Sequence, residues 1–216
     1  MIIKNALKKI TVSQDQFIET DKNTIGRDKI NDINLNTNHA VIISGVRRCG
    51  KSTLLSLLMK KIKNYHYFNF EDTRVYGFEA ADFPKLYDIF KKRDKKAGYF
   101  CFDEIQNIDK WENFIRNLLD RKKKVILTGS NASLFSGELG TKLTGPHLRY
   151  ELYPFSYKEM LLFTKMKPGA GSFMKYLKYG GFPEYIKNPN IKILQELFYD
   201  IIERDIIIRN NIRNAR

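Results

Sequence analysis

A nine-residue run constrains this chain more than any other feature, because it sets two glycines, a lysine and two hydroxyls at fixed spacing. It fits G-x-x-x-x-G-K-[ST] and consists of Gly45, Val46, Arg47, Arg48, Cys49, Gly50, Lys51, Ser52 and Thr53. An apolar, β-prone stretch, 40–43, precedes it, and a leucine-rich helical stretch, 52–63, follows. A strand, a glycine loop and a helix in this order aim backbone N–H groups and the positive helix N-terminus at one point. The sequence therefore predicts a phosphate-binding loop over 45–53.

Each residue type in this loop suits a part of nucleotide binding. Gly45 and Gly50 allow the backbone to wrap a phosphate without Cβ clashes. We expect the ammonium group of Lys51 to reach the β- and γ-phosphates, and the Ser52 hydroxyl to ligate Mg²⁺. The loop therefore predicts a nucleoside triphosphate and Mg²⁺ as the bound cofactors.

A second motif supplies the carboxylates that such a site needs. The apolar stretch 99–102 predicts a strand, and Asp103 and Glu104 follow it directly. Because Mg²⁺ takes oxygen ligands, we expect Asp103 to hold the metal together with Ser52. Glu104 is then the candidate general base that polarises the attacking water. A strand ending in an acidic turn is the alternative, and the presence of the glycine loop favours the catalytic interpretation.

The next predicted strand, 125–128, ends in small polar residues. Thr128, Ser130 or Asn131 is a candidate to hydrogen-bond the γ-phosphate or the water, and we take Thr128 as the catalytic candidate. The alternative is an ordinary turn in which Ser130 or Asn131 caps a helix that begins at Ala132.

The chain as a whole predicts an α/β fold with a parallel sheet sandwiched by helices, followed by a small all-α lid domain. We expect the strand at 66–70 to be central in that sheet. We divide the chain into a lead-in segment, 1–38, with a short helix at 13–19, a core, 39–155, and a helical part, 156–216, which begins with a capping box of Ser156 and Glu159. Strands are predicted at 41–44, 66–70, 99–102, 125–128 and 148–152, and helices at 52–63, 83–92, 110–121, 132–139, 156–164, 173–179 and 191–208.

Charge and composition restrict the partners. Lys and Arg number 38 against 24 Asp and Glu, which leaves a net charge of +14. Basic clusters at 60–63, 91–96 and 121–124 suit a polyanion such as nucleic acid, or are a solvated surface at helix ends that complements helix dipoles. No apolar run is long enough for a membrane span, no signal peptide is evident, and the two cysteines form no disulfide framework, so we expect a cytoplasmic location.

Six short motifs occur in an order typical of one family: 45–53, 102–106, 127–130, 143–145, 152–156 and 180–184. Together they resemble the prokaryotic AAA-type ATPases, a family with a P-loop NTPase core. The resemblance implies Mg-dependent ATP hydrolysis with Lys51, Ser52, Asp103 and Glu104 in the roles given above, and coupling of nucleotide state to an unknown partner. It also implies a further C-terminal domain of unknown role, whereas this chain ends at Arg216.

One position departs from the family pattern. Pro146 stands where the family typically has an arginine that is a candidate to stabilise transition-state charge. Either hydrolysis is slow, or the arginine comes from elsewhere: from the nearby Arg149 or from a neighbouring copy in a homo-oligomer. The paired Arg47 and Arg48 either add charge stabilisation or face a partner, and the sequence does not choose between these roles.

Other functions remain open at this stage. A nucleic-acid-binding module regulated by nucleotide, with weak or no hydrolysis, is the main alternative, and its basis is the net charge of +14. A nucleotide-bound scaffold without turnover is another. A small-molecule kinase is disfavoured, because Glu104 beside Asp103 suits a water nucleophile better than a bound acceptor.

Overall fold

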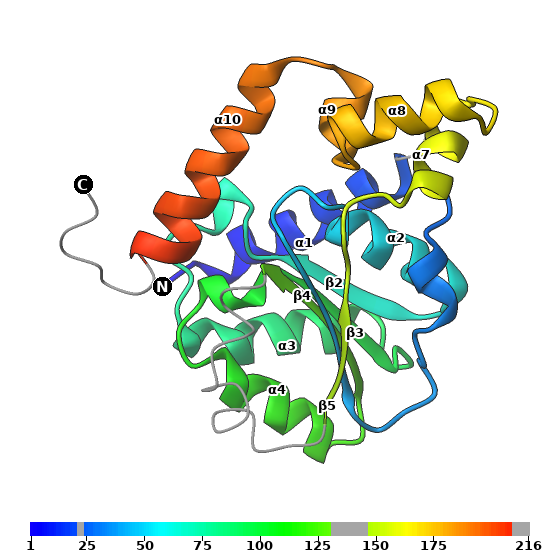
Figure 1. The fold of residues 1–216 in the computed structure, drawn as a ribbon. Helices are drawn as coiled ribbons and strands as arrows, with labels where there is room; N and C mark the ends of the chain where they lie inside the picture. Colours follow the sequence, from blue (N-terminus) through cyan, green and yellow to red (C-terminus); the bar gives the residue numbers. More distant parts are fainter. Residues whose placement is uncertain (21–23, 131–146, 209–216) are drawn as a thin grey trace.

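Five parallel strands form the centre of the part of the chain that the structure, a computed structural model, describes: residues 1–20, 24–130 and 147–208 (Figure 1). Their order across the sheet is β2-β3-β4-β1-β5. The strands are β1 (Ala40–Gly45), β2 (Tyr65–Asn69), β3 (Tyr99–Asp103), β4 (Lys124–Ser130) and β5 (His147–Glu151). All five predicted strands and the α/β fold are confirmed.

Helices cover both faces of this sheet, which is why the central strands β1, β3 and β4 are largely apolar. In β1 every residue is buried. Ile42 joins one core cluster with Phe102, and the next residue, Ile43, joins a second cluster on the opposite face with Leu54. The first cluster is completed by α1 (Lys4–Thr20), α3 (Phe83–Arg93) and α4 (Trp111–Asp120), and the second by α2 (Lys51–Lys61).

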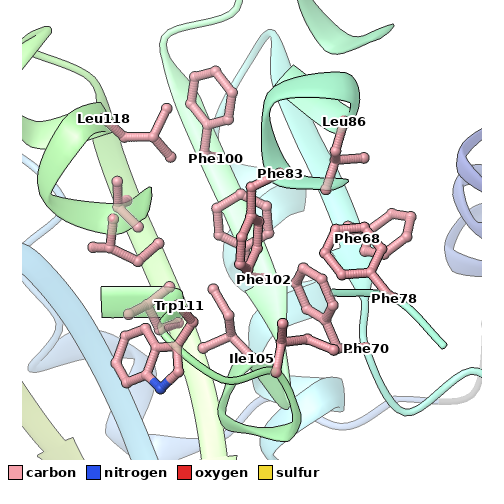
Figure 2. Packing of buried hydrophobic residues seen from close by; sticks show 14 of the residues in the cluster. Phe68, Phe70, Phe78, Phe83, Leu86, Phe100, Phe102, Ile105, Trp111 and Leu118 are labelled. Carbon is pink, nitrogen blue, oxygen red and sulfur yellow. The ribbon is translucent and has the colours of Figure 1, made fainter. Parts of the chain in front are cut away.

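The first core cluster contains a group of packed aromatic rings (Figure 2). Phe70 lies at its centre, with its ring centroid 4.8 Å from that of Phe68 and 5.3 Å from that of Phe78. Phe83 from α3 and Phe102 from β3 complete the contact, with centroids 5.8 Å and 5.9 Å from Phe70. The aromatic residues around β2 therefore serve the core.

The expected length of the first helix and the expected central position of β2 are wrong. The helix predicted at 13–19 is 17 residues long and begins at Lys4. The strand expected to be central, β2, lies at the edge of the sheet, and α1 packs against it. The Gln14 side chain donates to the Asn69 carbonyl at 3.1 Å and accepts from the Asn69 N–H at 2.9 Å. α1 thereby satisfies backbone groups that an edge strand otherwise exposes.

The segments described after Phe155 are helical, and they are called the lid here. They are α7 (Tyr157–Thr164), α8 (Ala170–Tyr179), α9 (Pro183–Lys187) and α10 (Ile191–Asp200), which continues as a π-helical segment, Ile201–Ile208. Figure 1 shows α7, α8 and α9 grouped beyond the upper end of the sheet, and α10 running back toward it. The predicted capping box is confirmed, because Ser156 and Glu159 each bind the other's backbone N–H. The predicted helix at 132–139 lies outside the described residues.

Among the described residues, no helix has the length and apolarity needed to cross a membrane.

Two glycines join the lid to the core. Gly180 ends α8 with a positive φ of 71°, and the Gly181 carbonyl accepts a hydrogen bond of 2.7 Å from the Phe155 N–H. A Cβ at Gly181 would lie 2.1 Å from the Phe155 carbonyl oxygen. Only glycine allows this approach of two backbones.

We predict that Gly181→Ala lowers the free energy of unfolding by about 2 kcal/mol or more, because backbone must move to accept the methyl group. Gly171→Ala in α8 is the matched control, since a Cβ there meets nothing within 4 Å. This control is expected to raise stability by up to about 1 kcal/mol through helix propensity. Urea denaturation checks both changes, and equal stability of the two variants would contradict the account.

His66 is a buried histidine in β2 on the aromatic side of the sheet. Its ring stacks on Phe90 with centroids 4.6 Å apart and lies 5.1 Å from that of Phe100. Its Nε2 atom lies 3.2 Å from the Asp94 carbonyl oxygen. Burial, followed by the charge of Arg93, lowers the pKa of His66 to about 4. The folded chain therefore resists protonation at this ring.

We predict that His66 makes the folded state less stable in acid. The unfolded chain binds a proton near the ordinary pKa of 6.5, whereas the folded chain does so only near 4. The titration of His66 therefore leaves the free energy of unfolding unchanged above about pH 6.5. It lowers this free energy by about 2 to 3 kcal/mol as the pH falls to about 4. Denaturation curves of the wild type and His66→Gln over this range should converge toward low pH. A constant difference between the two would refute the prediction.

Candidate functional site

A cavity of about 650 Å³ lies at the carboxyl edge of the sheet, where the predicted phosphate loop meets the lid. Six loop residues line it: Arg47, Arg48, Gly50, Lys51, Ser52 and Thr53. Glu71 reaches it from the segment after β2, and Glu104 from the end of β3. Phe155, Phe163, Pro183, Glu184 and Asp200 close it from the lid side. The sequence-predicted loop and the acidic motif thus share one cavity.

Backbone geometry explains the two glycines of the loop. A Cβ at Gly45 would lie 2.4 Å from the Leu152 carbonyl oxygen and 2.8 Å from the Cys49 sulfur. Gly50 precedes α2 with a φ of 99°, a conformation that favours glycine. Gly45 therefore allows the close passage of the chain after β5, and Gly50 allows the turn into the helix.

Lys51 begins α2 and is the central cation of the cavity. Its side chain is 4% exposed, and its ammonium nitrogen donates to the Val46 carbonyl at 3.1 Å. The same nitrogen lies 3.4 Å from Oε1 of Glu104, whose side chain is 9% exposed. The loop backbone thus folds around the Lys51 side chain, which also pairs with the carboxylate of Glu104 at the end of β3.

Asp103 is the last residue of β3 and is almost completely buried. It accepts hydrogen bonds from the hydroxyls of Thr128 and Ser52, and from Tyr67 at 3.4 Å. Burial and the neighbouring charge of Glu104 raise the pKa of Asp103 to about 6, against the opposing effect of these hydrogen bonds. A cation bound nearby would stabilise the ionised form of this buried carboxyl group.

Glu104 follows β3 in a left-handed conformation with a φ of 51°, which is unusual for a residue other than glycine. Its backbone N–H donates to the Thr128 hydroxyl at 3.2 Å, and its carboxylate accepts from the Gln106 amide. This backbone turn brings the carboxylate into the cavity beside Lys51. Strained backbone of this kind is typical of functional sites.

Two of the four predicted catalytic residues, Thr128 and Arg149, do not line the cavity. The hydroxyl of Thr128 is fully buried and bonded to Asp103 and to the N–H of Glu104, so it does not face the cavity as the sensor role requires. Arg149 is exposed on β5, in register with Ile42, and does not line the cavity. Its catalytic role within one copy of the chain is therefore not supported. Asn131 and Pro146 lie outside the described residues.

Sequence reasoning missed a buried ion pair behind the loop. Nε of Arg27 lies 2.9 Å from Oε1 of Glu159, and the two side chains are 3% and 5% exposed. The same guanidinium donates to the carbonyl of Cys49 at 2.8 Å and of Tyr153 at 2.7 Å. Arg27 therefore joins the lead-in segment, the loop, the end of the core and α7. The capping box identified Glu159, but no local pattern identified its partner 132 residues away.

The other loop side chains are also engaged. Burial raises the pKa of the Cys49 thiol, which is buried and unreactive in this setting. Arg47 pairs with Glu71 at 3.1 Å, and Arg48 pairs with Glu184 at 2.7 Å. Each charged residue of the loop thus contacts a carboxylate from another part of the fold.

Comparisons with known proteins agree with this geometry. A family model described as an AAA domain matches residues 37–161, more than half of the chain. The uncharacterized protein MJ1544 of Methanocaldococcus jannaschii is 34% identical over 233 residues, which cover 100% of this chain and 52% of that protein. An uncharacterized protein of Haemophilus influenzae is 32% identical over 195 residues, or 83% of this chain and 49% of that protein. The chain spans about half the length of these relatives.

Solved structures share the fold at low identity. The S. cerevisiae Hsp104–ADP complex gives a TM-score of 0.57 at 14% identity, over 94% of this chain and 36% of that one. AMPPCP-bound DnaA from Aquifex aeolicus gives 0.51 at 14% identity, over 91% of this chain and 65% of that one. With a glycine loop after β1, an acidic motif after β3, the family model and two relatives above 30% identity, this chain belongs to the AAA domain family of P-loop ATPases.

Proposed function

We propose that this chain binds ATP with Mg²⁺ and hydrolyses it, and that its nucleotide state is coupled to a partner through the lid. One observation carries the proposal: Lys51, Ser52 and Glu104 line a single cavity, and Asp103 lies behind them, bonded to Ser52. These residues come from the start of α2 and the end of β3.

Phosphate binding is assigned to the loop, 45–53. Its backbone amides and the N-terminus of α2 supply hydrogen bonds and positive potential without a change of fold. Lys51 is the cation for the β- and γ-phosphates. Without nucleotide, the Lys51 ammonium group contacts the Val46 carbonyl and the Glu104 carboxylate. In the proposal, bound phosphates replace these two partners.

The residues present fit Mg²⁺. Asp103 and Glu104 are adjacent and buried, and burial, followed by the charge of Glu104, raises the pKa of Asp103. Ser52 and Asp103 are the residues that would hold the ion. Among the described residues no group of three or more metal-binding side chains exists, so phosphate and water would supply the other ligands. The ion would add charge neutralisation at the phosphates.

Glu104 is the proposed general base. When phosphates engage Lys51, the carboxylate of Glu104 loses its cation and is left to accept a proton from water. Thr128 is a positioning residue rather than a sensor in this proposal, since its one hydroxyl holds both Asp103 and the Glu104 backbone.

We predict that Glu104→Gln lowers the rate of phosphate release from ATP by at least about 100-fold while ATP still binds, because the amide cannot accept the proton. Glu112→Gln in the first turn of α4 makes the same chemical change outside the cavity and should retain full turnover. Steady-state phosphate release and a calorimetric titration measure the two quantities. Normal turnover in Glu104→Gln would exclude Glu104 as the base.

A second candidate function, nucleic-acid binding regulated by nucleotide, is favoured by the distribution of charge. The three basic clusters, 60–63, 91–96 and 121–124, stand between a helix end and the start of β2, β3 and β4 respectively. Because these strands are neighbours and parallel, the clusters lie together at the amino-terminal ends of the strands. The cavity lies at the opposite, carboxyl-terminal ends. Exposed cations at the amino-terminal edge include Lys61, Lys63, Lys91, Lys92, Lys95, Lys96, Arg121 and Lys122. Such an edge suits the phosphate backbone of a nucleic acid.

We predict that a triple variant at this edge, Lys92→Glu, Lys95→Glu and Lys122→Glu, weakens duplex DNA binding and lowers the slope of log K against log salt by about 3. A control with the same change in net charge, Lys9→Glu, Lys175→Glu and Lys178→Glu, alters exposed residues of α1 and α8. Fluorescence anisotropy over a salt series measures both. An equal loss in the two variants would mean that net charge alone is responsible.

A further inference from the structure

The phosphate loop and the lid are joined by an ion pair that crosses the cavity. Arg48 leaves the loop from a left-handed conformation with a φ of 59°. Its Nη1 atom lies 2.7 Å from Oε2 of Glu184 in the first turn of α9, and its Nη2 atom lies 3.8 Å from Oδ2 of Asp200 at the end of α10. All three side chains line the cavity that holds Lys51 and Ser52. A cation of the loop is thus held by carboxylates of two lid helices.

The lid has a second attachment of opposite character. At α7 the lid is fixed by Arg27 and Glu159, whose side chains are 3% and 5% exposed. The Arg48 contact is open to solvent, with 42% of the arginine and 47% of the Glu184 side chain exposed. Breaking a buried pair leaves an uncompensated charge, whereas a solvated pair contributes little and exchanges readily. The Arg27 pair at α7 is therefore a fixed attachment, and the Arg48 pair at α9 and α10 is a releasable one, beyond the backbone contact of Gly181 with Phe155.

A phosphate group in the cavity would weaken the pairing of Arg48 with the lid in two ways. The planar guanidinium of arginine can bind two oxygens of one phosphate, and the higher charge of a phosphate favours it over partly solvated carboxylates. The same phosphate would repel the negative charges of Glu184 and Asp200, which line its cavity. Both effects favour the transfer of Arg48 from the lid to the ligand.

We propose that Arg48 is an exchange contact: without nucleotide it ties α9 and α10 to the loop through Glu184 and Asp200, and bound ATP phosphates take it over and release that end of the lid. This rests on the proposed function, because it requires nucleotide in the cavity. The exchange of Arg48 would couple the nucleotide state to the position of the lid. In this proposal α10 moves, while α7 stays attached through Arg27.

The first test uses the nucleotide-free protein and hydrogen–deuterium exchange of residues 183–200. Arg48→Ala and the double variant Glu184→Gln with Asp200→Asn should each raise the exchange rate of this segment several-fold. Glu71→Gln is the matched control, because it removes the ion pair of Glu71 with Arg47 but leaves the contact of Arg48 with the lid. Residues 157–164 should not change in any variant, since Arg27 holds α7. Unchanged exchange over 183–200 in Arg48→Ala would overturn the proposal.

The second test adds ATP and Mg²⁺ to chains that also carry Glu104→Gln, which is expected to prevent turnover. ATP should raise exchange over 183–200 to the level of the double variant, and it should cause no further rise in that variant. The double variant should also bind ATP about three- to tenfold more tightly, because two repelling charges are gone. ATP binding without a change over 183–200 would refute the exchange contact and leave the proposed function intact. No ATP binding to any variant in calorimetry would refute both.

Discussion

The parallel order of the sheet is the constraint on which the site depends. Because β1, β3 and β4 are neighbours that run in one direction, their carboxyl ends meet at the same edge. The glycine loop after β1, the carboxylates after β3 and the Thr128 hydroxyl in β4 come together there for that reason. The chain leaving β5 then passes so close to the loop that residue 45 must be glycine.

Because the charged groups at the carboxyl ends of the strands are buried, they interact strongly with one another. Asp103 and Glu104 are adjacent and nearly inaccessible, and Lys51 balances only part of their charge. This deficit favours a site for a cation and a phosphate over a purely structural cluster. Burial also separates the two attachments of the lid. The Arg27 pair is enclosed and permanent, whereas the Arg48 pair is solvated and open to competition from a ligand.

Local patterns predicted much of this molecule. Strands buried on both faces are recognisable as apolar runs, and the capping box at Ser156 lies within four residues of sequence. The full length of α1 was not predictable, because Leu7 and Ile10 are its only described buried hydrophobic residues and Gln14 acts through a strand 55 residues away. The pairing of Arg27 with Glu159 and the turn of Thr128 toward Asp103 depend on tertiary packing. Sequence therefore predicted that the loop and Glu104 lie together, but not that Arg27 supports the loop or that Thr128 holds Asp103 and the Glu104 backbone.

The most direct test of the central claim is a calorimetric titration of ATP into the wild-type chain and Lys51→Ala, each with and without Mg²⁺. The account predicts that the wild type binds ATP, that Mg²⁺ tightens binding by about tenfold or more, and that Lys51→Ala loses most of the affinity. Equal affinity in the two proteins, or no binding by the wild type in the presence of Mg²⁺, would contradict the assignment of the cavity as a nucleotide site.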